Sequence, residues 1–563
     1  MKLLSLHCDY ITFKPLKKAL KNPEKLSKER EGEITVKDPL VILTAVEKQD
    51  ESNKNILEQY SAEIESLAKQ VQAKNIVLYP YAHLSSSLSA PDFALELLEQ
   101  AQKKLEKNFK VVRAPFGFYK TFELKCKGHP LSELSREIKL TTKDEDTQIV
   151  DTKQLLREMA KTKLDTRLLK DNDHRILAQK MDLFSFWETA PGMVFWHHQG
   201  LIIFNQLINF WREAHIKAGY QEIKTPQILD KKLWLISGHW DKYKENIFIS
   251  EYEKRPFAVK PMNCPGGMLV YKASPKSYKD LPQRVAELGI VHRQELSGVL
   301  SGLFRVIQFT QDDAHIFCTE KQLEEEIEQI MELIDMFYKK FGFTYHVELS
   351  TRPQKRIGDE KVWDKAEATL ESVMNKKKMK FKVNEGDGAF YGPKIDFHIK
   401  DSLNRTWQCA TIQLDFAMPQ RFDLKYVDKD NKEKQPIMLH RVIYGSLERF
   451  IGILLEHTNG HLPLWLAPRQ VRIINFTDRN NGSCQKLAQE LLKTNIRVSL
   501  DISSEPLQGK IKQAEIEKVS YIIVIGDKEE KANTLAVRQQ GKVTPMDRDE
   551  FIQKISKEIQ DKI

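Results

Sequence analysis

The first quarter of the chain alternates between two hydrophobic patterns. Short apolar runs bounded by polar residues predict β-strands, and apolar residues that recur every three or four positions predict amphipathic helices. Strands are therefore expected at residues 2–6, 40–46, 76–79 and 110–113, with helices at 53–71 and 91–108. This mixture predicts a compact α/β domain over residues 1–142.

A highly charged stretch, almost free of aromatic residues, separates this domain from a larger block. Such composition is typical of a connector, so residues 143–185 are predicted to form a charged helical linker. Residues 186–467 contain all eight tryptophans and mix strand patterns with amphipathic helices, which predicts an α+β domain. One expected helical face carries Leu323, Ile327, Ile330, Met331 and Ile334.

The last block repeats a strand and helix order. Its strands are expected at residues 471–476, 498–501 and 521–525, and its helices at 483–494 and 507–517. Crossover helices between strands are typical of parallel sheets. Residues 468–563 are therefore predicted to form an α/β domain with a parallel sheet.

Length and charge change this picture little. A chain of 563 residues exceeds what one hydrophobic core usually supports, which agrees with several domains. Lysine and arginine outnumber aspartate and glutamate by 88 to 79, an excess that fits a phosphate-rich partner as well as an ordinary solvated surface. No apolar run approaches the roughly 20 residues of a membrane-spanning helix, so we expect a soluble protein.

The six cysteines are scattered and form no CxxC pair. The opening residues MKLLSLHCDY lack the order of charged, apolar and small residues that marks an export signal. Both observations favour a reducing, cytoplasmic location without a disulfide framework.

Three residues of the kinds that bind zinc lie far apart in the central block. They are Cys264 in KPMNCPGG, His315 in FTQDDAHIF and His440 in IMLHRVIYGS. Taken singly, each is more often structural, because cysteines are commonly buried and histidines commonly satisfy core hydrogen bonds. Their spacing alone therefore does not establish a metal site.

The strings around these three residues occur together in one enzyme family. Across its whole length the central block resembles the antiparallel-sheet catalytic domain of threonyl-tRNA synthetase, a class II aminoacyl-tRNA synthetase, with the family's strings in the family's order. The resemblance implies that Cys264, His315 and His440 bind one Zn²⁺ per subunit. The open coordination positions would take the amino group and the hydroxyl of threonine, and valine lacks that hydroxyl.

The resemblance also assigns the side chains around threonine and ATP. Those expected to contact threonine are Asp313, as acceptor from the hydroxyl, with Gln311, Tyr391 and Gln413. Those expected to contact ATP, which binds with Mg²⁺, are Arg293 at the α-phosphate, Arg449 at the γ-phosphate, Glu295 at the adenine amino group and Phe309 at the base face. Phe309 has the alternative interpretation of a core aromatic. The chain has no GxxxxGK[ST] phosphate loop, which argues against a P-loop mechanism.

Further strings extend the resemblance. His239 in SGHW would assist transfer to the tRNA 3′ end, and Lys394 and Gln408 would lie near the substrate and the tRNA end. Pro226 in YQEIKTPQI matches motif 1, which implies a homodimer. Many relatives carry histidine where this chain has Gly267, and because the three metal ligands remain we expect altered contacts around the metal and not its loss.

Residues 1–142 resemble the archaeal-type editing domain of the same family, which is related in fold to D-aminoacyl-tRNA deacylases. The strings LHCDY, YPYAHLSS and APFGFYKTFELKCKGHPLSELS carry the resemblance. It implies hydrolysis of misattached serine, which zinc recognition cannot exclude, at a site formed by His83, Tyr119, Lys120 and Glu133. Taken alone, Lys120 would be solvated and Glu133 would belong to a helix. Bacterial-type relatives edit in a different domain with an HxxxH pattern, and residues 1–142 contain none.

Residues 468–563 resemble the anticodon-binding domain of class II synthetases through APRQV and IGDKEEKANTLAVRQQGK. Glu529 and Arg538 would contact anticodon bases, with a plain surface ion pair as an equal alternative. Ser504 stands where some relatives carry an asparagine that contacts the anticodon.

The combined resemblance implies ATP-dependent ligation of L-threonine to tRNA(Thr), with removal of serine. A catalytically idle, RNA-binding paralogue is one alternative, and it predicts changes at Arg293, Arg449 or the zinc ligands, none of which is seen. A class II ligase for proline or serine is another. The Cys–His–His set argues against proline, and a serine-removing domain would defeat a serine ligase.

Overall fold

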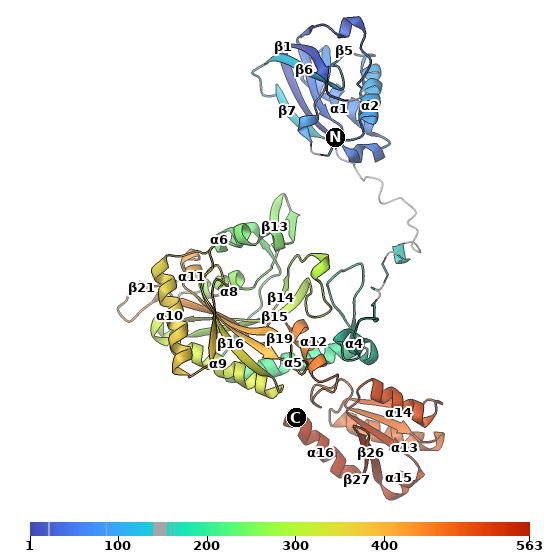
Figure 1. Ribbon diagram of the computed structural model, residues 1–563, viewed down its shortest axis with the longest axis vertical. Helices are drawn as coiled ribbons and strands as arrows, with labels where there is room; N and C mark the ends of the chain where they lie inside the picture. The colour runs from blue at the N-terminus through green and yellow to red at the C-terminus, as the bar shows by residue number, and fades with distance from the viewer. Residues whose placement is uncertain (21–22, 86, 139–154, 158, 161, 163) are drawn as a thin grey trace. The chain divides into compact units, whose positions relative to one another are not determined.

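The computed structural model describes residues 1–563 except 21–22, 86, 139–154, 158, 161 and 163 (Figure 1). The chain divides into two compact units, Met1–Val150 and Asp151–Ile563. The predicted domain limits stay predictions, and residues 143–154 of the predicted linker lie outside the described residues. None of the helices in the described ranges is both long and apolar enough to cross a bilayer.

One long strand organises the first unit. The elements are β1 (Lys2–Lys18), β2 (Ile34–Lys37), β3 (Pro39–Ala45), α1 (Ile56–Val71), β4 (Asn75–Pro80), α2 (Pro91–Leu105), β5 (Lys110–Arg113), β6 (Phe118–Cys126) and β7 (Glu133–Glu137). The first part of β1 pairs with β3 and β7 and the second part with β2 and β6, all antiparallel. β3, β4 and β5 continue the sheet in parallel.

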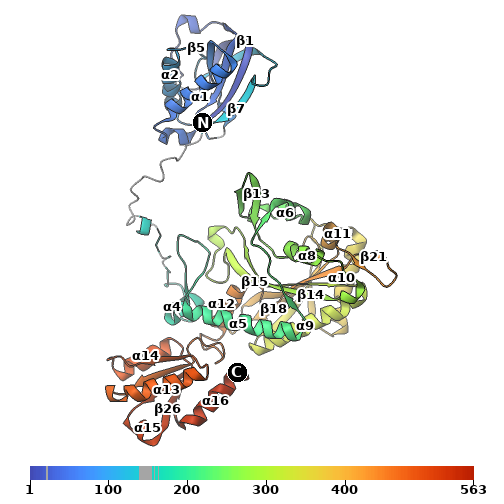
Figure 2. The same ribbon diagram turned by 180° about the vertical axis from the view of Figure 1, so that it is seen from behind.

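Helices α1 and α2 lie side by side on one face of this sheet (Figures 1 and 2). Their apolar faces bury Tyr60, Ile64 and Leu98 against strand residues such as Ile42. The α/β expectation for this segment is confirmed. The expected strand at residues 2–6 was too short, because apolar alternation continues through Ile11 and Phe13 onto a second core on the other face.

The second unit begins with an α+β region. Its helices are α4 (His174–Met181), α5 (His198–Lys217), α6 (Lys231–Ser237), α7 (His239–Lys242), α8 (Cys264–Lys272), α9 (Leu323–Lys340), α10 (Glu360–Lys376), α11 (Ala417–Arg421) and α12 (Leu447–His457). Its strands are β8 (Phe184–Ser185), β9 (Phe195–Trp196), β10 (Gln221–Glu222), β11 (Ile228–Asp230), β12 (Ile249–Tyr252), β13 (Arg255–Val259), β14 (Gln283–His292), β15 (Gln308–Cys318), β16 (Thr344–Ser350), β17 (Phe381–Asn384), β18 (Lys394–Lys400), β19 (Thr406–Asp415), β20 (Tyr426–Val427), β21 (Glu433–Lys434) and β22 (Ile437–Val442).

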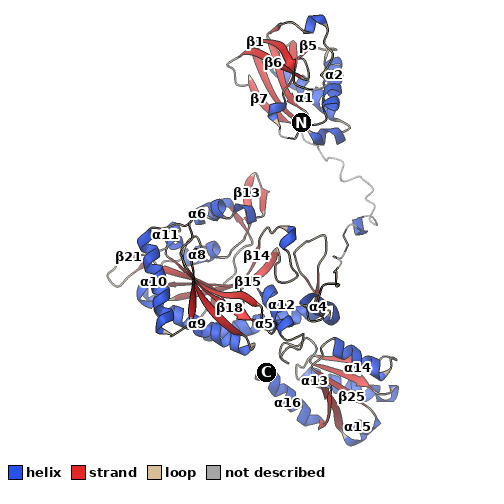
Figure 3. Ribbon diagram, viewed as in Figure 1, coloured by secondary structure: helices blue, strands red, loops and turns tan. Residues whose placement is uncertain are grey.

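An eight-stranded sheet forms the centre of this region, in the order β10-β14-β15-β22-β19-β18-β16-β17. Its central strands are antiparallel, and only the outer pairs β10–β14 and β16–β17 are parallel. Helices α9 and α10 pack beside each other along the sheet (Figure 3). The apolar face expected on α9 is confirmed, since all five of its predicted residues are buried in the core. Helix α4, from the end of the predicted linker, packs into the same core through Leu177 and Met181.

The C-terminal region contains a mixed sheet. Its elements are β23 (Val471–Asn475), α13 (Asn481–Lys493), β24 (Val498–Asp501), α14 (Leu507–Ile516), β25 (Tyr521–Ile525), α15 (Asp527–Ala532), β26 (Thr534–Gln539), β27 (Lys542–Asp547) and α16 (Arg548–Gln560). The expected parallel strands β24, β23 and β25 are confirmed. The prediction of a wholly parallel sheet was wrong, because β26 and β27 add an antiparallel hairpin. Its turn residues, Gln540 and Gly541, both have positive φ.

Candidate functional site

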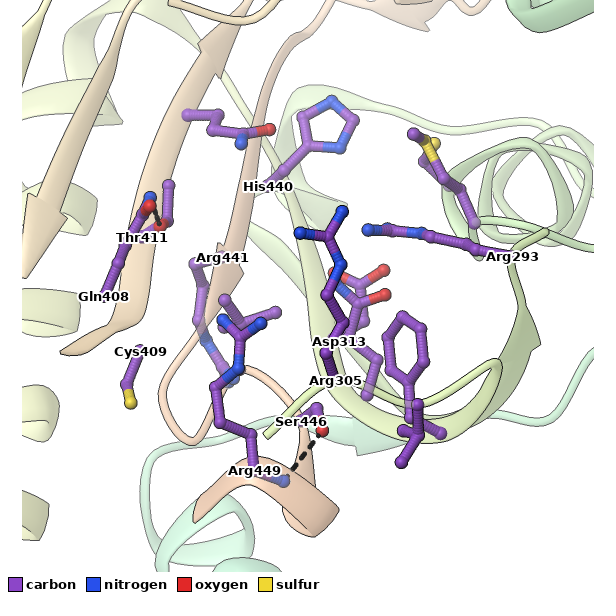
Figure 4. A pocket seen from close by; sticks show the side chains of 18 of the residues that line it. Arg293, Arg305, Asp313, Gln408, Cys409, Thr411, His440, Arg441, Ser446 and Arg449 are labelled. Atoms are coloured by element: carbon purple, nitrogen blue, oxygen red, sulfur yellow. Dashed lines mark hydrogen bonds between the residues drawn. The ribbon is translucent and has the colours of Figure 1, made fainter. Parts of the chain in front are cut away.

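A cavity of about 460 Å³ opens on the large sheet, at the end where β15, β19 and β22 approach α8 and α12. It gathers residues from distant parts of the sequence, including Cys264, Arg293, Asp313, His440 and Arg449. Figure 4 shows the guanidinium groups of Arg293, Arg305 and Arg449 directed toward this space, with His440 at its border. One cavity therefore holds side chains suited to a metal, to an amine or hydroxyl, and to phosphate.

The three residues of zinc-ligand type lie together. Cys264 begins α8, and His315 on β15 is the direct cross-strand partner of His440 on β22. One ligand atom from each residue lies within 4.8 Å of the others, and all three residues are buried. This is a tight cluster drawn from three separate segments.

The contacts of these three side chains are compatible with a bound cation. His315 Nε2 is buried without a hydrogen-bond partner among the described residues, and Cys264 is 3% exposed. His440 Nε2 lies 2.8 Å from Asp415 Oδ2, a contact that fixes the ring orientation. A Cβ at Gly267 would lie 3.3 Å from His315 Nδ1, so glycine allows this histidine to sit close to α8. The donor set of one sulfur and two imidazoles suits Zn²⁺.

Polar side chains continue from the cluster along the cavity. Asp313 Oδ2 lies 3.7 Å from His315 Nε2 and accepts a 3.3 Å hydrogen bond from Asn263 Nδ2. Burial raises the pKa of Asp313 to about 6. Gln311, Tyr391 and Gln413 also line the cavity, and the Tyr391 hydroxyl donates to Gln413 Oε1.

The two predicted phosphate-binding arginines both line the cavity. Arg293 Nε donates to Pro261 O at 3.2 Å, and its guanidinium lies 5.1 Å from the centre of the Phe309 ring. Arg449 Nε donates to Phe304 O at 2.9 Å, and burial lowers the pKa of Arg449. In both residues the remaining guanidinium nitrogens are available to an anion that enters the cavity.

Two buried carboxylates hold these elements in place. Asp312 accepts hydrogen bonds from the backbone N–H groups of Ile443, Tyr444 and Gly445, at 2.9 to 3.1 Å. Glu448 accepts from the N–H of Thr310 and thereby attaches α12 to β15. Burial raises the pKa of Asp312 and of Glu448 to about 7. The position of Arg449 relative to β15 therefore depends on these contacts.

Several predicted site residues form ion pairs or hydrogen bonds with other side chains of the protein. Glu295 lines the cavity but forms an ion pair with Arg305, at 2.8 Å. Lys394 does not line the cavity, and its Nζ lies 2.9 Å from both Asp387 and Asp396. Gln408 lines the cavity and donates to Asp396 Oδ1 at 2.6 Å.

His239 also lies outside the cavity lining. It is fully buried, with Nδ1 2.8 Å from Ser237 Oγ and Nε2 2.9 Å from the Met262 sulfur. Burial, with smaller contributions from nearby cationic groups, lowers the pKa of His239 to about 3. The ring is therefore neutral and without solvent contact in this structure.

Sequence reasoning missed ten residues of the cavity lining. They are Met262, Phe304, Arg305, Val306, Cys409, Thr411, Arg441, Val442, Gly445 and Ser446. Arg305 could have been suspected from LFRVIQF, since it stands in the loop that leads to Phe309. Arg441 follows His440 directly and is buried with its guanidinium over the Tyr220 ring, 4.4 Å from its centre.

Two of the predicted editing residues, Lys120 and His83, lie beside neighbouring tyrosine rings in the first unit. Lys120 Nζ donates to the carbonyls of Pro115 and Phe118, and it lies 5.1 Å from the centre of the Tyr79 ring. The centre of the Tyr81 ring lies 6.4 Å from the centre of the Tyr79 ring and 5.4 Å from the centre of the His83 ring. Burial lowers the pKa of Lys120 to about 8. Lys120 is therefore not the freely solvated lysine that its sequence alone suggests.

The other two predicted editing residues have surroundings that differ from those of Lys120. Tyr119 is 56% exposed and contacts Lys17. Glu133 is exposed on β7, which β1 and β3 separate from Tyr79 on β4. Taken alone, Glu133 was expected to lie in a helix. This expectation was wrong, because Glu133 pairs with Leu6 in the sheet.

The predicted anticodon residues occupy different surroundings. Glu529 Oε2 accepts from the N–H of Gly526 at 3.0 Å and so caps α15. Arg538 on β26 lies 3.7 Å from Glu515 and lines a second cavity, of about 750 Å³, that Glu529 does not line.

Comparison with family models matches three parts of the chain. Residues 246–458 match the class II tRNA synthetase core domain (G, H, P, S and T), and residues 1–138 match the archaea-specific editing domain of threonyl-tRNA synthetase. Residues 470–558 match an anticodon binding domain. These matches confirm the three expected domain types.

Individual proteins give the same picture. Threonine–tRNA ligase of Caldanaerobacter subterraneus subsp. tengcongensis is 54% identical over 392 residues, which are 69% of this chain and 61% of that protein. The ligase of Acetivibrio thermocellus is 53% identical over 395 residues, 70% and 62% of the two chains. The chain thus spans about three fifths of the length of these curated relatives. The crystal structure of the RNA binding domain of threonyl-tRNA synthetase from Cryptosporidium parvum Iowa II aligns with a TM-score of 0.66 at 39% identity, covering 68% of this chain and 98% of that one.

Proposed function

Because the chain belongs to the threonyl-tRNA synthetase family, we propose that it ligates L-threonine to tRNA(Thr) with ATP and hydrolyses misattached seryl-tRNA(Thr). One observation carries the synthetic half of this proposal. Cys264 and His440, which cluster with His315, line a single cavity together with the Asp313 carboxylate, Arg293 and Arg449. Such a cavity can hold an amino acid together with a nucleotide phosphate.

Zinc is the metal that this donor set fits. Cys264, His315 and His440 would hold it, with Asp415 orienting His440. When bound, the ion supplies a Lewis acid with positions open to the amine and hydroxyl of threonine. Asp313 lies where it can accept a hydrogen bond from that hydroxyl, so valine would leave a buried acceptor without its donor.

The arginines would act on ATP, which enters with Mg²⁺. In the proposed first step a threonine carboxylate oxygen attacks the α-phosphorus, the bond from that phosphorus to the bridging oxygen breaks, and pyrophosphate leaves. Arg293 and Arg449 would neutralise charge that develops on the phosphates, and the partly buried position of Arg449 strengthens this effect. A hydroxyl of the tRNA 3′ end then attacks the carbonyl carbon, and AMP leaves.

The remaining assignments rest on family membership and stay predictions. They are adenine contacts from Glu295 and Phe309, tRNA-end roles for His239, Lys394 and Gln408, anticodon contacts from Glu529 and Arg538, a homodimer and a cytoplasmic location. For editing, we propose that Lys120 and His83 bind the ester of the misattached serine. Lys120 lies over the Tyr79 ring and His83 contacts the Tyr81 ring, and the contact between these two tyrosine rings supports a common site.

Aminoacylation of tRNA(Thr) transcript tests the proposal. The wild-type chain should form threonyl-tRNA only with threonine, ATP and Mg²⁺ present. Arg449→Ala should slow threonine-dependent ATP–pyrophosphate exchange by about 100-fold or more, because it removes charge stabilisation at the reacting phosphates. Arg212→Ala removes an exposed arginine on α5 and should leave the rate unchanged. Equal rates for Arg449→Ala and the wild type would reject the assigned phosphate site.

A further inference from the structure

A second group of side chains of metal-ligand type lies on the large sheet, outside the lining of the cavity. His346 and Glu348 are on β16, and His398 is on β18, both of which can be located in Figures 1 and 2. His346 and His398 are direct cross-strand partners, and Glu348 follows His346 by two positions. All three side chains therefore project from the same face of the sheet.

The distances within this group suit a shared cation. His346 Nε2 lies 3.6 Å from one carboxylate oxygen of Glu348, and His398 Nε2 lies 3.6 Å from the other. These separations exceed ordinary hydrogen-bond lengths. Two ligand atoms, each about 2.1 Å from a tetrahedral ion, would lie roughly 3.4 Å apart, close to what is observed.

His398 supplies a second, independent observation. Its Nε2 atom is buried and has no hydrogen-bond partner within the described part of the chain. A buried ring nitrogen without a partner is costly, and metal coordination removes that cost. The two imidazole rings are stacked at 4.9 Å with an interplanar angle of 11°. The side chain of His346 is 46% exposed, so an ion can reach the group from solvent.

A third group of possible metal ligands shows why proximity alone is insufficient. Asp173, His174 and Glu456 also lie within coordination range of one another. There, His174 Nδ1 contacts Glu456 Oε1 at 2.6 Å, and Nε2 accepts from the N–H of Leu303 at 2.9 Å. Both ring nitrogens are thus in use, and this group is structural.

We propose that His346, Glu348 and His398 bind a Zn²⁺ ion, with a fourth position open to water. Two imidazoles and one carboxylate suit zinc, whereas Mg²⁺ prefers an all-oxygen environment. The site differs from the Cys264 cluster in lacking a thiolate. Glu348 is the cross-strand partner of Asp396, which in turn holds Gln408 and Thr411 of the cavity lining. The ion would therefore stabilise the pairing of β16 with β18, next to the residues that line one side of the cavity.

Cobalt titration of the full chain distinguishes the two sites. After the protein is stripped with a chelator, wild type should bind two Co²⁺ ions, only one with a thiolate-to-cobalt charge-transfer band. The variant His346→Ala/His398→Ala should lose one equivalent and keep the thiolate band. The control Thr344→Ala/Lys400→Ala alters the neighbouring exposed cross-strand pair on the same face and should bind both ions.

Unchanged Co²⁺ stoichiometry in the double histidine variant would overturn the proposal. If wild type bound Co²⁺ but showed no thiolate-to-cobalt charge-transfer band, the site at His346, Glu348 and His398 would be supported. The assignment of Cys264 as a metal ligand would then be rejected. A single His398→Ala change should weaken Co²⁺ binding at this site by more than about tenfold, since even indirect ligand contacts contribute that much. A zinc-dependent rise in Tm should be smaller in the double variant, while metal-free Tm values match and show that the fold is intact.

Discussion

At the scale of single residues, burial decides which protonation state acts. Lys120 holds its ammonium group between two backbone carbonyls and an aromatic ring, and burial lowers its pKa to about 8. An unfolded lysine keeps its proton up to about pH 10.4. Between these pH values the unfolded chain binds more protons. The stability cost of burying the charged ammonium is therefore full below about pH 8 and is relieved as pH rises from about 8 to about 10.4.

The same shift predicts the pH profile of editing. We expect protonated Lys120 to stabilise charge on the ester carbonyl, so enzyme-catalysed deacylation of seryl-tRNA(Thr) should fall as pH rises through about 8. Lys120→Arg should move this fall to higher pH, because guanidinium keeps its proton. Rates corrected for spontaneous hydrolysis give the profile.

Lys120→Ala should lower the deacylation rate by about 100-fold, within the range for a positioned acid or charge. Lys125→Ala is the matched control, since it removes an exposed lysine of the same strand that pairs with Asp9. Equal effects of the two substitutions would show that Lys120 has no special role.

At the scale of elements, one glycine determines how closely α8 and β14 approach. A Cβ at Gly289 would lie 2.1 Å from Asn263 Oδ1, and Asn263 donates to Asp313. Gly289→Ala should displace Asn263 and raise KM for threonine by about tenfold, or ~1.4 kcal/mol, with a smaller effect on KM for ATP.

Pyrophosphate-exchange kinetics with each substrate varied in turn measure this effect. Gly298→Ala is the control, because no heavy atom lies within 4 Å of its added Cβ. A Gly289→Ala protein with normal Tm and unchanged KM for threonine would separate Asn263 from substrate selection.

Elements also show what sequence patterns can and cannot predict. The apolar spacing on α9 predicted its buried face, because a single helix sets that periodicity. The hairpin of β26 and β27 was not predicted, because Gln540 and Gly541 adopt positive φ without being one of the Asn-Gly or Asp-Gly pairs that mark such a turn in a sequence. Likewise, the sequence singled out Cys264, His315 and His440 through family strings, whereas the pairing of His346 with His398 depends on strand register, which their separation in the sequence does not indicate.

At the scale of the whole molecule, the two compact units have separate hydrophobic cores. A chain without residues 1–142 should therefore still fold and attach threonine at a similar rate. It should also accumulate seryl-tRNA(Thr), because an active site that binds hydroxyl and amine accepts serine, and the missing methyl costs only about 1–3 kcal/mol.

Charging assays with serine, on full-length and truncated chains, measure this accumulation. Adding the isolated 1–142 segment should restore hydrolysis of seryl-tRNA(Thr). If both chains accumulated serine equally, the first unit would not be the editing domain.

The most direct test of the account compares ATP–pyrophosphate exchange with threonine, serine and valine before and after metal removal. The metal-loaded chain should respond strongly to threonine, weakly to serine and negligibly to valine, and chelation or Cys264→Ser should abolish the threonine response. Cys484→Ser, a buried thiol in the C-terminal domain, should change none of these rates. Full activity and undiminished preference for threonine over valine in the metal-free protein would contradict the claim that a cation held by Cys264, His315 and His440 selects the amino acid.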